Sequence, residues 1–178
     1  MNGDDHSEKL DWMRGVLDRY EGPLTRYAAR LTGDLDRARD VVQDTFLRLC
    51  ETKRSKVDGH VAEWLFTVCR NRALDVQRKE SRLKPLDDAV LAVRESDDPS
   101  PATAAEQTET TSLVLQLIDS LPANQQEVVR LKFQNGLSYR EISGITKLSV
   151  SNVGFLIHTA VKNLRRGMNA HQGLEGRA

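Results

Sequence analysis

The stretch from His60 to Lys84 constrains the fold most, because its apolar residues recur with the spacing of one face of an α-helix. That face would carry Val61, Leu65, Val68, Cys69, Ala73 and Val76. Arg72 falls in the same sector and would have to extend its charged group out of it. The opposite face would carry Glu63, Thr67, Arg70, Asn71, Leu74 and Arg78. The spacing predicts a helix of about 37 Å that is buried on one side and faces either water or an anionic partner on the other.

Charge is divided unevenly along the 178 residues, although the formal net charge is +0. Residues 1–85 hold 17 basic and 15 acidic residues, a net charge of +2. Residues 86–111 hold 1 and 7, a net charge of −6, and residues 112–178 hold 8 and 4, a net charge of +4. The total alone would argue against a nucleic-acid binder, but two basic blocks that flank an acidic spacer are the more informative pattern.

Several kinds of site are absent from the sequence. Cys50 and Cys69 have no Cys or His partner at metal-ligand spacing, so both are expected to be buried reduced thiols. His60 and His158 stand alone, and there is no catalytic set of residues or phosphate-cradling glycine loop. No apolar run approaches about 18 residues, and the N-terminus has no signal-peptide core. We expect no metal, no cofactor, no enzymatic activity, no membrane insertion and a cytoplasmic location.

The start of the chain predicts a short lead and then a helical segment. Residues 1–8 read as a disordered lead. Helical spacing then runs through Leu10–Leu31, and Gly22-Pro23 interrupts it. We therefore predict a kinked helix or two abutting helices.

The helix predicted over Leu35–Glu51, which Asp34 is placed to cap, is strongly amphipathic. Its inward face would carry Leu35, Ala38, Val42, Phe46 and Leu49. Its outward strip would carry Asp36, Asp40, Gln43, Asp44, Leu47 and Arg48. Such a strip can dock a protein partner, and it can equally be a solvated helix face.

Two segments without helical spacing surround the long helix. The loop Thr52–Gly59 is basic, and its cations are Lys53, Arg54 and Lys56. Pro85–Thr111 contains three prolines and most of the acidic excess, with no sustained periodicity beyond Ala89–Val93. This composition predicts a flexible acidic linker over residues 86–111.

The second block, residues 112–178, begins with two predicted helices. The first is marked by Leu113, Leu117, Ile118 and Leu121. Pro122 would lie in the first turn of the next helix, and Asn135-Gly136 would end it.

A helix-turn-helix pattern follows. A capping box at Ser138–Glu141 opens an eight-residue helix, and a turn at 146–148 leads to Ser149 and a longer helix that ends near Arg166. Residues 167–178 read as a frayed, disordered tail. The sequence thus predicts an all-α protein of two small helical domains, the second with a helix-turn-helix.

The two blocks together resemble the sigma-70 family of bacterial transcription initiation factors, in particular its small two-domain extracytoplasmic-function (ECF) members. DRARDVVQDTFLRLCE and EWLFTVCRNRALDVQRK look like region two of that family. LPANQQEVVRLKFQNGLSYREISGITKLSVSNV looks like its region four. Both motifs, in this order and with an acidic linker between them, make the resemblance very specific.

The resemblance implies partners and residue roles. Core RNA polymerase would be bound on its clamp coiled coil by Asp40, Gln43, Asp44, Leu47 and Arg48, and on its flap by the second domain. The minus-ten promoter element would be read and opened by Lys53, Arg54, Lys56, Arg70, Asn71, Arg78 and Lys79. The minus-thirty-five element would be contacted by Ser149, Ser151, Asn152, Phe155, Lys162 and Arg166. An anti-sigma factor is a further candidate partner.

The final helix departs from the usual family pattern at Gly154, Phe155 and Leu156. Helical spacing turns Ser151, Asn152, Phe155, Thr159, Lys162 and Arg166 away from the core, so base readout by hydrogen bonds would depend mainly on the first two. Phe155 could contact thymine methyl groups, or it could pack against the first domain or an inhibitor, and we favour packing. Trp64 and Phe66 could stack on bases, but Trp64 is expected in the core.

Promoter opening is beyond a protein of this size acting alone. Opening ten base-pair steps costs roughly 14 kcal/mol, whereas capturing two unstacked bases returns only about 2–6 kcal/mol. The 26 linker residues could stretch to about 90 Å but average near 28 Å as a free coil, so they would not measure the spacing of two DNA sites. A large rigid partner must do so, and core polymerase is the candidate.

Two other functions stay open from the sequence. A stand-alone helix-turn-helix regulator would bind duplex DNA tightly without polymerase, at a palindromic site. A protein-only adaptor would bind polymerase but not DNA, although the basic stretch Arg70–Lys84 weighs against it.

Overall fold

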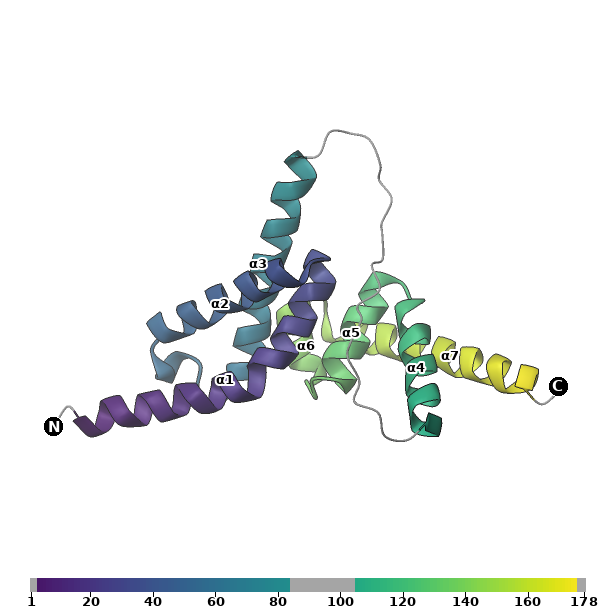
Figure 1. Cartoon of the computed structure of the whole chain (residues 1–178), viewed down its shortest axis with the longest axis horizontal. Helices are drawn as coiled ribbons and strands as arrows, with labels where there is room; N and C mark the ends of the chain where they lie inside the picture. Colours follow the sequence, from purple (N-terminus) through teal and green to yellow (C-terminus); the bar gives the residue numbers. More distant parts are fainter. Residues whose placement is uncertain (1–2, 84–104, 176–178) are drawn as a thin grey trace. The chain divides into compact units, whose positions relative to one another are not determined.

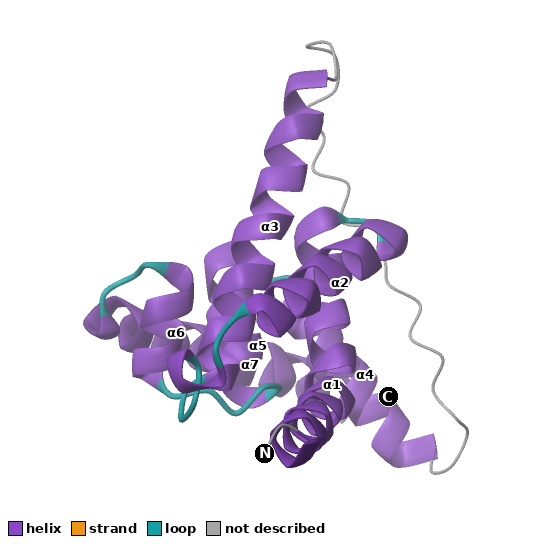
Figure 2. Ribbon diagram, turned by 90° about the vertical axis from the view of Figure 1, so that its left-hand side faces the viewer, coloured by secondary structure: helices purple, strands orange, loops and turns teal. Residues whose placement is uncertain are grey.

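The computed structural model describes residues 3–83 and 105–175, with side chains for residues 7–79, 81–82 and 111–171. These residues form helices joined by short loops, without a strand (Figure 2), which confirms the predicted all-α class. The chain divides into two compact helical units, Met1–Glu95 and Ser96–Ala178 (Figure 1). Most of the predicted acidic linker, 86–111, lies outside the described residues, and its described part from Ala105 is already helical.

The first unit is a bundle of three helices, α1 (Gly3–Thr32), α2 (Leu35–Glu51) and α3 (Val61–Leu83), with a single 3-10 turn, η1 (Arg54–Lys56), between the last two. α1 packs against α2 and α3, which also pack against each other (Figure 1). Their facing sides bury Leu24, Ala28, Val41, Leu49, Leu65 and Phe66. The rings of Tyr27 and Phe66 meet edge to face with centroids 5.3 Å apart. Each large apolar side chain buried in this way contributes about 1.5–3 kcal/mol.

α1 begins earlier than the sequence predicts. The expected disordered lead, residues 1–8, is wrong from Gly3 onward. The early turns of α1 have partners in η1 and in the last turn of α2, which local spacing cannot reveal. Glu8 pairs with Arg54 at 2.9 Å, and Lys9 Nζ donates to the carbonyl of Cys50 at 3.3 Å. Pro23 lies inside one continuous helix, which changes direction along its length (Figure 1).

α2 has the predicted bounds and the predicted cap, since Asp34 Oδ1 accepts a hydrogen bond from the backbone N–H of Arg37 at 2.9 Å. The predicted inward residues are buried except Leu35, which is 50% exposed because it is the first residue of the helix and precedes the part that meets α1 and α3. Cys50 is also exposed, so the expectation of a buried thiol there is wrong. It follows Leu49 by one position, and that step turns it off the buried face.

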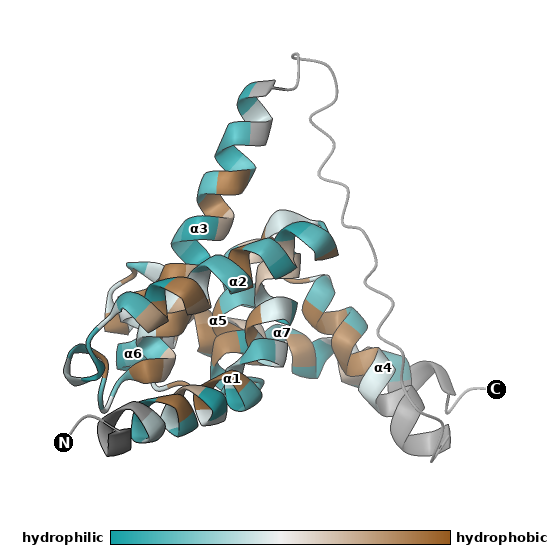
Figure 3. Ribbon diagram, turned by 60° about the vertical axis from the view of Figure 1, so that its left-hand side comes forward, coloured by the Kyte–Doolittle hydropathy of each residue, from teal (hydrophilic) through white to brown (hydrophobic). Residues whose placement is uncertain are grey.

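α3 covers the predicted long helix to within one residue at each end. Leu65, Cys69 and Ala73 are buried. Phe66 is also buried and Trp64 is half-buried, so both aromatic residues lie on the core side of α3. The C-terminal part of α3 projects beyond α1 and α2 (Figures 2 and 3) and is mostly hydrophilic in Figure 3.

The second unit contains α4 (Ala105–Asp119), α5 (Ala123–Phe133), α6 (Tyr139–Thr146) and α7 (Val150–Glu175). α7 packs against the other three helices. The helix-turn-helix core buries Val128, Leu131, Leu137, Ile142, Ile145 and Val153. A second apolar cluster joins Ile118, Leu121, Val129 and Ala160 with Val114 and Leu164. This second cluster attaches α4 to the helix-turn-helix.

Local chemistry sets the start of α6 as predicted, and the bounds of α5 differ from the prediction by one or two residues. Pro122 lies at the N-cap position of α5, one residue before the expected first turn. Gly136 lies in the loop between α5 and α6 and has φ +69°. Glycine adopts this left-handed conformation without steric cost. The capping box of α6 is present: Ser138 Oγ accepts from the N–H of Glu141, and Glu141 Oε2 accepts from the N–H of Ser138.

α7 is longer than predicted, so the frayed tail expected from residue 167 is wrong through Glu175. The reason is a contact with α4. Gly167 lies so close to Leu117 that a Cβ added to the glycine would be 2.6 Å from a Leu117 methyl carbon. Packing on α4 gives these turns a partner that local spacing does not show. Among the described helices, none has the length and apolarity needed to cross a membrane.

Candidate nucleic-acid interface

The α2 strip comprises Asp40, Gln43, Asp44, Leu47 and Arg48. Helical spacing brings these five side chains together on the outer face of α2. Four of them are exposed, and the Leu47 side chain is a large apolar group left 55% exposed. Asp44 is half-buried, because its Oδ2 accepts a hydrogen bond from Nε of Arg72 at 2.7 Å. This ion pair shows how Arg72 leaves the apolar sector of α3.

The basic loop, residues 52–60, presents Lys53, Arg54 and Lys56 on the surface. It is anchored by Val57, which is fully buried, and by backbone hydrogen bonds to the carbonyls of Lys53 and Arg54. The guanidinium of Arg54 pairs with Glu8 and lies 5.4 Å from the ring centroid of Trp12. Local spacing could not predict this involvement of α1, because Glu8 and Arg54 are 46 residues apart.

The exposed side of α3 carries the other residues predicted for the minus-ten element. Asn71, Arg78 and Lys79 are exposed, and Arg70 is half-buried. Asp75 pairs with Arg78 at 3.4 Å, so this acidic residue has a partner within its own helix. Both side chains of this pair are more than half exposed, so it contributes little to stability.

The turn between α6 and α7 is held by several hydrogen bonds. Lys147 has φ +62° and ends α6, with its N–H donating to the carbonyl of Ser143. Ser143 Oγ donates to the carbonyl of Leu148 at 2.6 Å. Ser149 Oγ accepts from the N–H of Asn152 at 3.2 Å, so this hydroxyl caps α7. The start of α7 is therefore fixed in direction, and its helix dipole places partial positive charge there.

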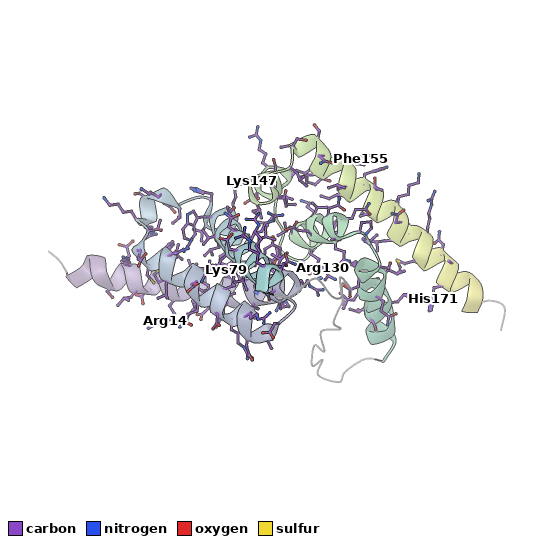
Figure 4. The ribbon with its side chains drawn as sticks, turned by 90° about the horizontal axis from the view of Figure 1, so that it is seen from above. Arg14, Lys79, Arg130, Lys147, Phe155 and His171 are labelled. Carbon is purple, nitrogen blue, oxygen red and sulfur yellow. The ribbon has the colours of Figure 1, made fainter. Side chains whose placement is uncertain are left out.

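The α7 stripe comprises Ser151, Asn152, Phe155, Lys162 and Arg166. All five residues are exposed, whereas Val153, Leu156, Ile157 and Ala160 face the core. Thr159, predicted on the same side, is half-buried. Figure 4 shows Phe155 near the start of α7 and Lys147 on the preceding turn.

Lys147 and Arg140 also lie exposed on the helix-turn-helix, and the sequence prediction missed both. The signal that could have identified them is their place in the pattern. Arg140 is in the first turn of α6, and Lys147 immediately follows α6. Lys147 lies in the turn that leads directly into α7.

Two buried polar side chains, one in each unit, have partners within their own unit. Arg130 has a side chain only 4% exposed, and its Nη2 donates to Asp119 Oδ1 at 2.5 Å, which joins α5 to α4. Burial raises the pKa of the Cys69 thiol from 9.0 to about 12, although a hydrogen bond with Thr45 acts in the opposite direction. Among the described side chains, no His, Cys, Asp and Glu come together in a group that could hold a metal ion.

Comparison with known families matches both units. The model of Sigma-70 region 2 matches residues 16–83, and that of Sigma-70, region 4 matches residues 111–164. The two matched ranges contain α2, α3, α5 and α6 in full and α7 as far as Leu164.

Similar proteins cover most of the chain. The ECF RNA polymerase sigma factor SigL of Mycobacterium tuberculosis is 32% identical over 159 residues, which are 86% of this chain and 86% of SigL. SigM of Bacillus subtilis is 28% identical over 159 residues, 86% of this chain and 96% of SigM. The fold resembles the sigma factor RpoE in its complex with the anti-sigma factor NepR from Bartonella quintana, with a TM-score of 0.67 and 22% identity over 93% of this chain and 97% of that one. The chain belongs to the sigma-70 family, as an ECF RNA polymerase sigma factor with regions 2 and 4.

Proposed function

We propose that this sigma factor recruits core RNA polymerase through the α2 strip and directs it to promoters with the basic loop, α3 and α7. A sigma factor is a transcription initiation factor and not an enzyme. The observation that carries the proposal is the α7 stripe. α7 is the second helix of the helix-turn-helix, and it exposes polar and cationic side chains on one face while its other face is buried. This is the geometry by which such a helix enters the major groove.

The α2 strip is the proposed contact with the polymerase clamp coiled coil. An exposed leucine among acidic, amide and basic groups supplies an apolar centre with polar surroundings, which suits a protein interface. The second unit would dock on the polymerase flap. These contacts would set the separation of the two DNA-binding surfaces, which a linker cannot do.

The basic loop and the projecting part of α3 are the proposed surface for the minus-ten element. Lys53, Lys56, Arg78 and Lys79 are exposed cations that phosphates can approach. Because Arg54 already pairs with Glu8, a phosphate would have to compete for its guanidinium. Lys147 is added to the proposed contacts at the minus-thirty-five element, beside the capped start of α7.

An anti-sigma factor is a further proposed partner. Two proteins of similar fold were solved in complexes: the sigma factor RpoE with the anti-sigma factor NepR, and CnrH with the cytosolic domain of CnrY. Exposed Leu47 and Phe155 are apolar groups that such a protein could cover.

Run-off transcription with core polymerase, with and without this protein, tests the proposal. Promoter-dependent transcripts should require both components, and binding to promoter DNA should be much weaker without polymerase. A stand-alone regulator would bind duplex DNA equally well alone. A protein-only adaptor would bind polymerase without changing promoter choice.

A further inference from the structure

Phe155 is the most exposed large apolar side chain of the described residues, with 66% of its surface open. It lies on α7 one turn after Ser151 and Asn152, two turns before Lys162 and three turns before Arg166. Its neighbours along the exposed face are therefore hydrogen-bonding and cationic groups, which suit a nucleic acid better than an apolar protein surface.

The backbone that carries Phe155 is held in place by α6. The ring of Tyr139 lies over Gly154, where an added Cβ would be in ordinary contact with Tyr139 Cε2 at 3.6 Å. Lys132 Nζ lies 5.5 Å from the centroid of the same ring. Tyr139 thus packs on the position next to Phe155 without covering it, and the phenylalanine ring stays open in a fixed part of the helix.

We propose that Phe155 is a specificity-determining residue that contacts the C5-methyl group of a thymine in the minus-thirty-five element. The inference rests on the proposed function, since it requires α7 in the major groove. The thymine methyl is the apolar group that bases present in this groove, and apolar side chains are the ones that contact it. A phenylalanine cannot donate or accept a hydrogen bond to the other base edges, so it favours thymine over cytosine at one position.

The test removes the methyl group alone. The DNA is a duplex selected by the holoenzyme from a random-sequence library, and each thymine of its upstream element is replaced in turn by deoxyuridine. The affinity of holoenzyme made with wild-type protein should fall about fourfold at one position, the loss expected when one methyl-sized contact is removed. Holoenzyme with Phe155→Ala should bind the thymine duplex more weakly and should be insensitive to that replacement.

Two variants complete the design. Phe155→Leu keeps an apolar contact and should keep the sensitivity to deoxyuridine. Phe133→Ala removes another exposed phenylalanine, 62% open and on α5, and should leave the sensitivity unchanged. Circular dichroism checks that each variant is folded.

Three results would overturn the inference. If every deoxyuridine duplex binds wild-type holoenzyme as the thymine duplex does, no methyl group is read. If Phe155→Ala keeps the full sensitivity, another residue reads the methyl. If scrambling the upstream element leaves the affinity of wild-type holoenzyme unchanged, α7 is not in that groove, and the proposed function fails together with the inference. If scrambling lowers the affinity, the proposed function stands and the deoxyuridine results decide the role of Phe155 alone.

Discussion

Asp44 on α2 and Arg72 on α3 form an ion pair, with Arg72 Nε donating to Asp44 Oδ2 at 2.7 Å. The pair connects a residue proposed to bind polymerase to the helix proposed to bind DNA. Because the side chains are 40% and 33% exposed, the pair is screened by water and is worth at most about 1 kcal/mol. If Asp44 contacts polymerase as proposed, a charge change at this residue should affect both binding and stability.

Replacing Asp44 with Arg should weaken binding to core polymerase and also lower the stability of region 2. Adding Arg72→Asp should restore the ion pair with its polarity reversed, and hence the stability, but not the affinity for polymerase. The tryptophans, Trp12 and Trp64, both belong to the first unit, so their fluorescence follows its unfolding. Asp40→Lys, at an exposed position of the same strip, should weaken polymerase binding without loss of stability. If neither Asp44→Arg nor Asp40→Lys changes the affinity for polymerase, the α2 strip is not part of the interface.

Replacing Arg78 and Lys79 together with Ala should lower the slope of log affinity against log salt by up to about 1.8, because each phosphate contact contributes about 0.9. The measurement is promoter binding by holoenzyme over a range of salt concentrations. Arg14→Ala is a matched control, since Arg14 forms an exposed i,i+3 pair with Asp11 much as Arg78 does with Asp75. A double variant with the slope of the wild type would exclude both cations from the contact.

Replacing Lys147 with Gly should raise stability and weaken DNA binding at once. Its φ of +62° is unfavourable for a side-chain-bearing residue, so glycine should add up to about 1 kcal/mol to the free energy of unfolding of region 4. The lost charge should lower the salt slope by about 0.9. Lys147→Arg keeps both the charge and the strain and should change neither quantity, whereas a glycine variant with an unaltered slope would show that this cation touches no phosphate.

Replacing Ser138 with Ala should cost region 4 about 1 kcal/mol, because the N–H of Glu141 loses its acceptor. Region 4 has no tryptophan, so its unfolding appears in far-ultraviolet circular dichroism and not in tryptophan fluorescence. Ser138→Asp should retain most of the stability, and Ser112→Ala, at an exposed position of α4, should have little effect. Equal losses at Ser112 and Ser138 would argue against a capping role.

The two thiols should differ in reactivity. Native protein at pH 8 should expose one thiol to an aromatic disulfide reagent, that of Cys50, and the second only in denaturant. The raised pKa of Cys69 means that the folded state binds more protons than the unfolded state between pH 9 and about 12. The stability that comes from the neutral thiol is thus complete below pH 9 and is lost as pH rises toward 12. The free energy of unfolding of Cys69→Ala should therefore depend less on alkaline pH than that of Cys50→Ala. Two rapidly reacting thiols in the native protein would contradict the burial of Cys69.

The features that sequence predicted well depend on near neighbours. The bounds of α2 and the capping box of α6 follow from Asp34, Ser138 and Glu141 acting within three or four residues. The exposure of the α7 stripe follows from helical spacing alone. The residue roles taken from the family resemblance stay predictions until the experiments above are done.

The features that sequence missed depend on distant partners. The early start of α1 is stabilised by Glu8 with Arg54, and the late end of α7 by Gly167 against Leu117. Asp44 and Arg72 are 28 residues apart, so their pairing could not be read from either helix. Each of these contacts appears only when the helices are packed.

The continuity of α7 has a mechanical consequence. Its 26 residues form a rod about 39 Å long, with the Ser149 cap at one end and the seat on Leu117 near the other. Because the same helix carries the α7 stripe and packs against α4, α5 and α6, the proposed DNA-binding face cannot shift without disturbing the core of the second unit.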